Sequence, residues 1–280
     1  MSEQEKTDKY ISYSQLSKQS ECKHLHWLES ISKLKKRTAN QYSAYGLALE
    51  DTLEKIFIET ALGDRKEHED QDYFHDFLEQ EIELVEEIDP ELLIKQYEAG
   101  TECIKNFESE FNKKFKNYEL VETQKKIKKK LPHSHPLYNF IFYGIIDLVI
   151  RHNNKIIIID YKTTNKGWSS YALQDSLKLM QFYLYKLFYL SIKGNENEDI
   201  ECCYIFFNTT TQKIEIKMVP VTDDDMTWVY TKIGSFIYNA YEKLDYSRNA
   251  VCGKYCGCQD YVDAQKKLNN NTKQEGINNV

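Results

Sequence analysis

Two aspartates and a lysine stand out because they lie on apolar segments that a short polar stretch connects. Asp147 follows two isoleucines, and Asp160 and Lys162 follow four consecutive isoleucines at 156–159. Side chains alternate along a strand, so Asp160 and Lys162 share a face. The asparagines at 153–154 can supply the two positive-φ positions of a tight hairpin turn. Any symmetric loop centred between them places Asp147 directly opposite Asp160.

Opposed carboxylates on apolar strands call for a cation. Directly opposed residues have Cβ atoms roughly 4.5–5.5 Å apart, so the two charges repel and lose hydration unless a cation lies between them. Oxygen ligands favour Mg²⁺ or Mn²⁺, which take further oxygens from a substrate phosphate. Such an ion polarises a phosphodiester and lowers the pKa of a bound water, while Lys162 orients that water or neutralises the phosphate. The alternative is a surface hairpin whose aspartates point to solvent, which the four isoleucines disfavour.

Two helices supply further candidates for this site. In the helix expected at 170–191, polar residues recur at intervals of four, three and four, opposite a leucine-rich stripe. These residues are Gln174, Lys178, Gln181 and Tyr185. We expect one face of this helix to pack on the sheet and the polar face to contact substrate or brace the metal ligands. On an earlier helix, Glu50 and Glu54 share a face, an arrangement that by itself indicates only a solvated surface.

The remaining pattern places these residues in the order helix, three strands, helix, two strands, helix. Continuous or alternating apolar runs predict strands, and apolar residues at helical spacing predict helices. We expect strands at 118–131, 138–150, 155–163, 201–208 and 213–220, and helices at 45–61, 91–117, 170–191 and 222–244. Another acidic helix precedes Pro90, where the two helical pieces separate. This order predicts an α/β fold.

The motifs in this order resemble the RecB-like, phage-type exonuclease branch of the PD-(D/E)XK nucleases. They are Gly144-Ile145-Ile146-Asp147, Asp160-Tyr161-Lys162, and a helix with Gln181 and Tyr185. The resemblance implies a restriction-endonuclease-like core with a mixed central β-sheet flanked by helices. It implies that Asp147 and Asp160 bind Mg²⁺ or Mn²⁺ and that Lys162 assists the attacking water. Gln181 and Tyr185 would support the site and contact DNA, and Glu50 would be the third carboxylate where many relatives carry histidine.

The resemblance extends to the cysteines. A serine-rich opening leads to Cys22, as in AddB-type and CRISPR-adaptation nucleases, in which such a cysteine and three near the C-terminus bind an iron–sulfur cluster. The corresponding residues here are Cys22, Cys252, Cys256 and Cys258. Their internal spacing, x3 then x1, departs from the x2 then x5 of that arrangement, so a 4Fe-4S cluster, zinc and reduced thiols all stay open. Cys103, Cys202 and Cys203 are expected in the core.

The domain organisation follows from these assignments. We expect a mostly helical part at 1–117 that includes the Glu50 helix, and a nuclease core at 118–245. A cysteine-rich segment at 246–266 is expected to pack near the N-terminus, and a disordered tail follows at 267–280 because it has almost nothing to bury.

Composition bounds the partners and the location. The net charge of −7 argues against indiscriminate coating of nucleic acid, although a basic run at 125–130 could follow a phosphate backbone or protect an edge strand. No apolar run could span a bilayer, so we expect a cytoplasmic protein of a bacterial or phage-infected cell. The leading expectation is a DNA exonuclease in recombination, repair or phage DNA metabolism, acting on single strands or ends, with a helicase or recombination partner. The alternatives are an inactive DNA-binding or scaffold subunit and an RNA-directed nuclease.

Overall fold

The computed structural model describes residues 6–35, 39–169, 171–247, 256 and 258. The chain forms two compact units. The first contains Met1–Tyr10 and Thr38–Val229, and the second contains Ile11–Arg37 and Tyr230–Val280. Cys252 and the tail expected at 267–280 lie outside the described residues, and the predicted segment boundaries stay predictions.

A mixed sheet of six strands within the described residues forms the centre of the first unit. The strands are β1 (Thr7–Ile11), β2 (Glu119–Lys130), β3 (Tyr138–His152), β4 (Lys155–Thr164), β5 (Ile200–Asn208) and β6 (Ile214–Val219). Their order is β1-β3-β4-β5-β6, and β2 also pairs with β3. Only β4 and β5 are parallel among the registers from β2 to β6. The expected α/β fold with a mixed central sheet is confirmed; β1 was not predicted.

The β3–β4 hairpin has the predicted turn. Asn153 and Asn154 adopt φ values of 51° and 62°, as the two central residues of a type I′ turn require. The antiparallel ladder runs from the pair His152–Lys155 to the pair Leu148–Ile159. The next step of this register places Asp147 across from Asp160.

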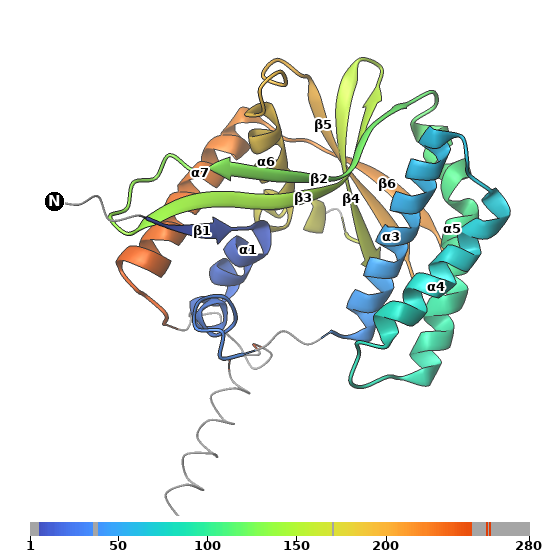
Figure 1. Cartoon of the computed structure of the whole chain (residues 1–280), viewed down its shortest axis with the longest axis horizontal. Helices are drawn as coiled ribbons and strands as arrows, with labels where there is room; N and C mark the ends of the chain where they lie inside the picture. Colours follow the sequence, from blue (N-terminus) through green and yellow to red (C-terminus); the bar gives the residue numbers. More distant parts are fainter. Residues whose placement is uncertain (1–5, 36–38, 170, 248–255, 257, 259–280) are drawn as a thin grey trace, which may run out of the picture. The chain divides into compact units, whose positions relative to one another are not determined.

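Three helices cover one face of the sheet: α3 (Gln41–Leu62), α4 (Asp70–Ile82) and α5 (Pro90–Lys114). Figure 1 shows them lying together beside the strands. Buried residues of all three pack in one cluster with Leu148, Ile159 and Phe207 of the sheet. The capping box of Asn40 with Ser43 starts α3 four residues earlier than predicted, so Gly46 lies inside the helix.

Helix α6 (Ser176–Leu190) packs on the other face. Its Phe182 ring lies 4.4 Å from that of Tyr204 on β5, and Phe188 stacks on Phe142 of β3 at 4.3 Å. The helix begins six residues later than predicted because the Asp175 carboxylate accepts a hydrogen bond from the Leu177 N–H and caps it. The sheet of the first unit is therefore covered by helices on both faces.

The second unit contains α1 (Tyr13–Glu21), α2 (Lys23–His26) and a π-helical turn, η1 (Trp27–Ile31). The last part of α7 (Asp223–Ile237) and a second π-helical turn, η4 (Tyr238–Glu242), also belong to it, whereas one helix to 244 was predicted. The Gln19 amide donates to the Phe236 carbonyl at 3.2 Å, which joins the two ends of the chain inside this unit. None of the described helices is long and apolar enough to cross a membrane.

Candidate active site

The strands β3 and β4 separate where their acidic residues lie. Their ladder ends at Leu148–Ile159, after which β4 continues along β5 as far as the pair Thr164–Asn208. At the separation, the Asp147 carboxylate accepts a hydrogen bond of 2.8 Å from the Tyr161 backbone N–H. A side chain thus replaces the next ladder bond, and the two aspartates share the gap between the strands.

Asp160 and Asp147 both lie in surroundings that disfavour their charged forms. Asp160 is 1% exposed, and its carboxylate forms an ion pair with Lys162. Burial raises the pKa of Asp160, although Lys162 opposes the shift. Burial and then the charges of Asp160 and Glu50 hold the pKa of Asp147 well above its ordinary value. Ionising both acids is therefore costly here, and Lys162 offsets this cost only in part.

Glu50 reaches this site from α3. One turn earlier, Gly46 lies against β4, since a methyl group there would contact the Thr163 hydroxyl at 3.6 Å. The Glu50 carboxylate accepts a hydrogen bond of 2.6 Å from the Gln124 side-chain amide of β2. Its pKa is raised by burial, lowered by the Gln124 bond, and raised again by the charge of Asp160. Glu50 is thus electrostatically linked to both aspartates.

A chain of hydrogen bonds from α6 supports Lys162. The Lys162 ammonium donates to Gln181 Oε1 at 3.2 Å, and Gln181 Nε2 donates to the Tyr185 hydroxyl at 2.9 Å. That hydroxyl donates to the carbonyl of Ile145 on β3. A methyl group at Gly144 would lie 3.1 Å from the Tyr185 ring, so the glycine makes room for it. The glycine motif and the Gln-x-x-x-Tyr motif meet through this contact.

The structure brings together most of the predicted site residues but not all. Asp160, Lys162, Gln181 and Tyr185 are joined by the contacts above. Asp147 accepts from the backbone of Tyr161 beside them, and Glu50 is linked to both aspartates by charge. The predicted polar stripe is divided, because Gln181 and Tyr185 are buried whereas Gln174 and Lys178 are not. Gln174 lies in a short 3₁₀ turn before α6. Gln124 was missed, and nothing in its sequence context distinguishes it.

The donor set fits a hard divalent cation. All three carboxyl groups offer oxygen ligands, as Mg²⁺ and Mn²⁺ prefer, and one lysine faces three acids. The oxygens of the three carboxyl groups do not all lie within 4.8 Å of one another. Among the described residues, only the sulfurs of Cys22, Cys256 and Cys258 do so. Gln124, Lys162 and the Tyr161 N–H each hold one carboxylate instead.

The three cysteine sulfurs form a separate group in the second unit. Cys22 Sγ lies 3.7 Å from Cys258 Sγ, and Cys256 Sγ lies 3.2 Å from Cys258 Sγ. Cys22 Sγ also accepts a hydrogen bond of 3.3 Å from the Leu25 N–H. Leu28 packs with them. Cys103, Cys202 and Cys203 are fully buried, as predicted.

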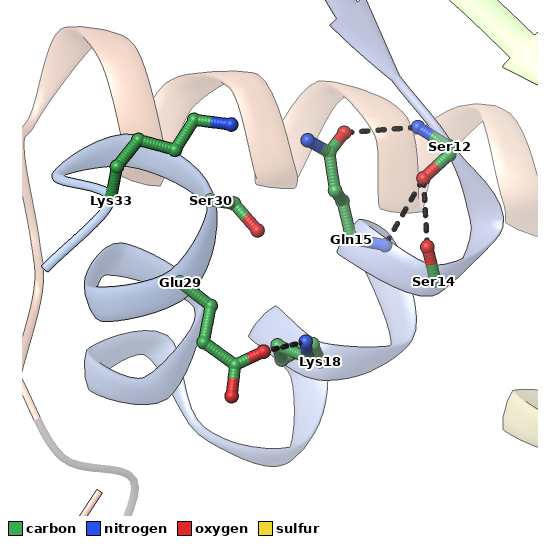
Figure 2. A pocket seen from close by; sticks show the side chains of 7 residues that line it. All are labelled: Ser12, Ser14, Gln15, Lys18, Glu29, Ser30 and Lys33. Atoms are coloured by element: carbon green, nitrogen blue, oxygen red, sulfur yellow. Dashed lines mark hydrogen bonds and ion pairs between the residues drawn. The ribbon is translucent and has the colours of Figure 1, made fainter. Parts of the chain in front are cut away.

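A polar pocket of about 220 Å³ lies in the second unit. Figure 2 shows its lining, which is Ser12, Ser14, Gln15, Lys18, Glu29, Ser30 and Lys33. Several of these groups satisfy one another: Ser12 and Gln15 form the capping box of α1, and Lys18 pairs with Glu29. The serine-rich opening of the sequence therefore has a structural role in starting α1.

Comparison with known proteins identifies the family. The family model described as the PD-(D/E)XK nuclease superfamily matches residues 10–261. The crystal structure of a candidate exonuclease from Eubacterium rectale is similar, with 12% identity, a TM-score of 0.53, and coverage of 88% of this chain and 86% of that one. The structure of SSO0001 matches at 18% identity over 86% and 90% of the two chains, with a TM-score of 0.34. No curated protein matches the sequence.

Proposed function

The chain belongs to the PD-(D/E)XK nuclease superfamily, and from this premise we propose that it is a DNA exonuclease dependent on Mg²⁺ or Mn²⁺. The observation that carries the proposal is the gap between β3 and β4. There Asp147 and Asp160 are neighbouring acids whose ionisation is costly, and Lys162 offsets this cost only in part. In this proposal Glu50, Asp147 and Asp160 hold the metal.

The residues around the metal ligands have separate tasks in the proposed reaction. A bound divalent ion supplies Lewis acidity and a water of lowered pKa. The Lys162 ammonium, held by Asp160 and Gln181, donates to the attacking water or to a phosphate oxygen. Gln181 and Tyr185 fix the position of this ammonium, because Tyr185 is anchored on the Ile145 carbonyl. A lysine held at both sides loses little freedom when the substrate binds.

The substrate and pathway rest on the order of the motifs. Gly144 to Asp147, Asp160 to Lys162, and Gln181 with Tyr185 follow the RecB-like pattern, which favours DNA ends or single strands. The name of the Eubacterium rectale protein agrees with an exonuclease. We place the chain in DNA recombination, repair or phage DNA metabolism, with a helicase or recombination protein as its partner.

The test compares four substrates in Mg²⁺ and in Mn²⁺. End-labelled linear single-stranded DNA, linear duplex DNA, circular single-stranded DNA and RNA are incubated with wild type and Lys162→Ala. We expect the linear DNAs to be degraded to short products, with circles resistant and the variant at least ~100-fold slower. Lys166→Ala, which removes another lysine four residues along the chain, is the matched control.

Each outcome separates the alternatives. Digestion of circles identifies an endonuclease, and preference for RNA identifies an RNA-directed enzyme. Equal cleavage by wild type and Lys162→Ala removes the catalytic assignment. Metal-independent DNA binding without cleavage of any substrate identifies the inactive scaffold.

We further propose that the cysteine group binds a single tetrahedral ion, with zinc as the candidate. Sulfurs around one such ion, at about 2.3 Å each, lie about 3.8 Å apart. The Cys22–Cys258 separation of 3.7 Å is near that value, and the Cys256–Cys258 separation of 3.2 Å is shorter. In a 4Fe-4S cluster each thiolate binds a different iron, which spaces the sulfurs more widely. Cys252, outside the described residues, is the fourth candidate ligand.

Metal analysis of anaerobically purified protein tests the cysteine proposal. We expect about one zinc per chain, lost in Cys22→Ser and retained in Cys103→Ala. Brown protein with iron and acid-labile sulfide would instead identify a 4Fe-4S cluster. Colourless protein without zinc or iron would identify reduced thiols.

A further inference from the structure

Gln124 has an unusual backbone conformation at a specific place in the sheet. Its φ is +47°, in the left-handed region that residues with a side chain rarely adopt. Its neighbours keep the ladder, since Thr123 pairs with Leu148 and Lys125 pairs with Ile146. Gln124 therefore lies directly across from Asp147. The irregularity therefore occurs at the position of β2 that lies across from Asp147, on the side of β3 opposite β4.

The side chain of Gln124 has a defined partner. Its amide Nε2 donates to Glu50 Oε1 at 2.6 Å, which connects β2 to α3. An amide N–H stabilises the ionised carboxylate, and this bond lowers the pKa of Glu50 against the effect of burial. With Oε1 bound to the amide, Glu50 has Oε2 left to offer to a cation.

We propose that Gln124 is a positioning residue of the metal site, holding the Glu50 carboxylate as a ligand for a divalent cation. The inference rests on the proposed function, which makes Glu50 a ligand. The left-handed backbone fits this role, because strained conformations persist where surrounding structure fixes them and concentrate at functional sites. Partners that orient a metal ligand typically change metal affinity about 10- to 100-fold when removed.

Two substitutions separate the side chain from the backbone. Asparagine and glycine both accept the left-handed conformation, but Gln124→Asn shortens the amide by one methylene and Gln124→Gly removes it. We expect both variants to stay folded and to bind Mn²⁺ about 10- to 100-fold more weakly than wild type. Binding is measured on metal-free protein by titration with Mn²⁺, followed by electron paramagnetic resonance of the free ion, without any substrate.

Gln212 supplies a matched control. It is also a glutamine in the left-handed region, with φ +55°, but it lies in the connection between β5 and β6. Gln212→Asn and Gln212→Gly should keep the wild-type affinity for Mn²⁺. The melting temperatures of all four metal-free variants report whether they are folded.

The outcomes distinguish this inference from the proposed function. If Asp147→Asn and Asp160→Asn bind Mn²⁺ as tightly as wild type, the metal site itself is wrong. If those variants lose Mn²⁺ while folded Gln124→Asn or Gln124→Gly keeps wild-type affinity, Gln124 only shapes β2 and the inference is overturned. Loss of Mn²⁺ in the aspartate variants, weakened binding in the folded Gln124 variants and unchanged binding in the Gln212 variants support the inference.

Discussion

Each acidic residue of the candidate site is restrained by one different neighbour. Asp147 accepts from the Tyr161 N–H, Asp160 pairs with Lys162, and Glu50 accepts from Gln124. Among the described residues, the three carboxyl groups share a single cationic neighbour, Lys162. Ionising all three therefore destabilises the fold, and burial strengthens the effect. At the residue scale, function and stability should therefore oppose each other.

Replacing Asp147 by asparagine should stabilise the metal-free protein. The pKa of Asp147 is raised in the fold, so its contribution to stability is present below the unfolded pKa and is lost as pH rises through the folded pKa. Asparagine keeps an oxygen for the Tyr161 N–H and removes the charge. We expect the free energy of unfolding at pH 7, measured in urea, to rise by about 1–2 kcal/mol, while DNA cleavage is lost.

Asp64→Asn is the control for this charge change, because Asp64 is exposed beyond the end of α3. It should change neither stability nor cleavage. A metal-free Asp147→Asn protein that is less stable than wild type would show that the aspartate is satisfied without a cation.

Tyr185→Phe should reduce the rate of cleavage without unfolding the protein. The substitution removes the hydroxyl that links Gln181 to the Ile145 carbonyl, so Gln181 and Lys162 lose their anchor. We expect kcat to fall about 10-fold or more, since small displacements of a positioned group are costly, with little change in KM. Steady-state kinetics on labelled single-stranded DNA measure this, and Tyr189→Phe, one turn further along α6, is the control. An unchanged kcat would show that Gln181 and Lys162 hold their positions without the Tyr185 hydroxyl.

At the scale of elements, α4 and α5 pack so closely that only glycine fits between them. A methyl group at Gly100 would lie 2.0 Å from the ring of Phe74, which is fully buried. Gly100→Ala should therefore lower the free energy of unfolding by about 1–3 kcal/mol, because Phe74 must move in a packed core. Urea unfolding measures the change.

Gly234 gives the matched comparison, since it lies inside α7 and a methyl group added there would meet no atom of the described residues within 4 Å. Gly234→Ala should raise the free energy of unfolding by about 0.5–1 kcal/mol through helix propensity alone. A Gly100→Ala protein that is as stable as Gly234→Ala would contradict the close packing of α4 on α5.

The elements that depend on local chemistry were predictable from sequence. The Asn153–Asn154 turn and its register followed from residue type, so the amino-acid sequence alone was enough to locate the Asp147–Asp160 pair. The strand at Thr7–Ile11 was missed because its sequence is mostly polar and its partner, β3, is distant in the chain. Gln124 was missed for a related reason: its conformation depends on Asp147 and Glu50, which tertiary packing brings near it.

At the scale of the whole molecule, two sets of buried ionisable groups give opposite pH dependences of stability. The acids of the first unit favour low pH in the absence of metal, because burial raises the pKa values of Asp147, Asp160 and Glu50. His26 of the second unit favours high pH, because burial, and then the charge of Lys18, lowers its pKa to about 4. We expect the pH dependence of the stability of the metal-free chain to be the sum of both effects.

His26→Phe should remove the second effect. The folded pKa of His26 lies below the unfolded value, so its contribution to stability is present above about pH 6.5 and is lost as pH falls towards 4, by on the order of 3 kcal/mol. Phenylalanine keeps a ring against Phe236, and His26 Nε2 is buried without a hydrogen-bond partner among the described residues, so no bond is lost there. We expect urea unfolding at pH 7 to be little changed and the variant to be more stable than wild type at about pH 4.5. If the free energies of unfolding of the two proteins change in parallel from pH 7 down to about 4, folding does not lower the pKa of His26. That result would place water or an acid beside its ring.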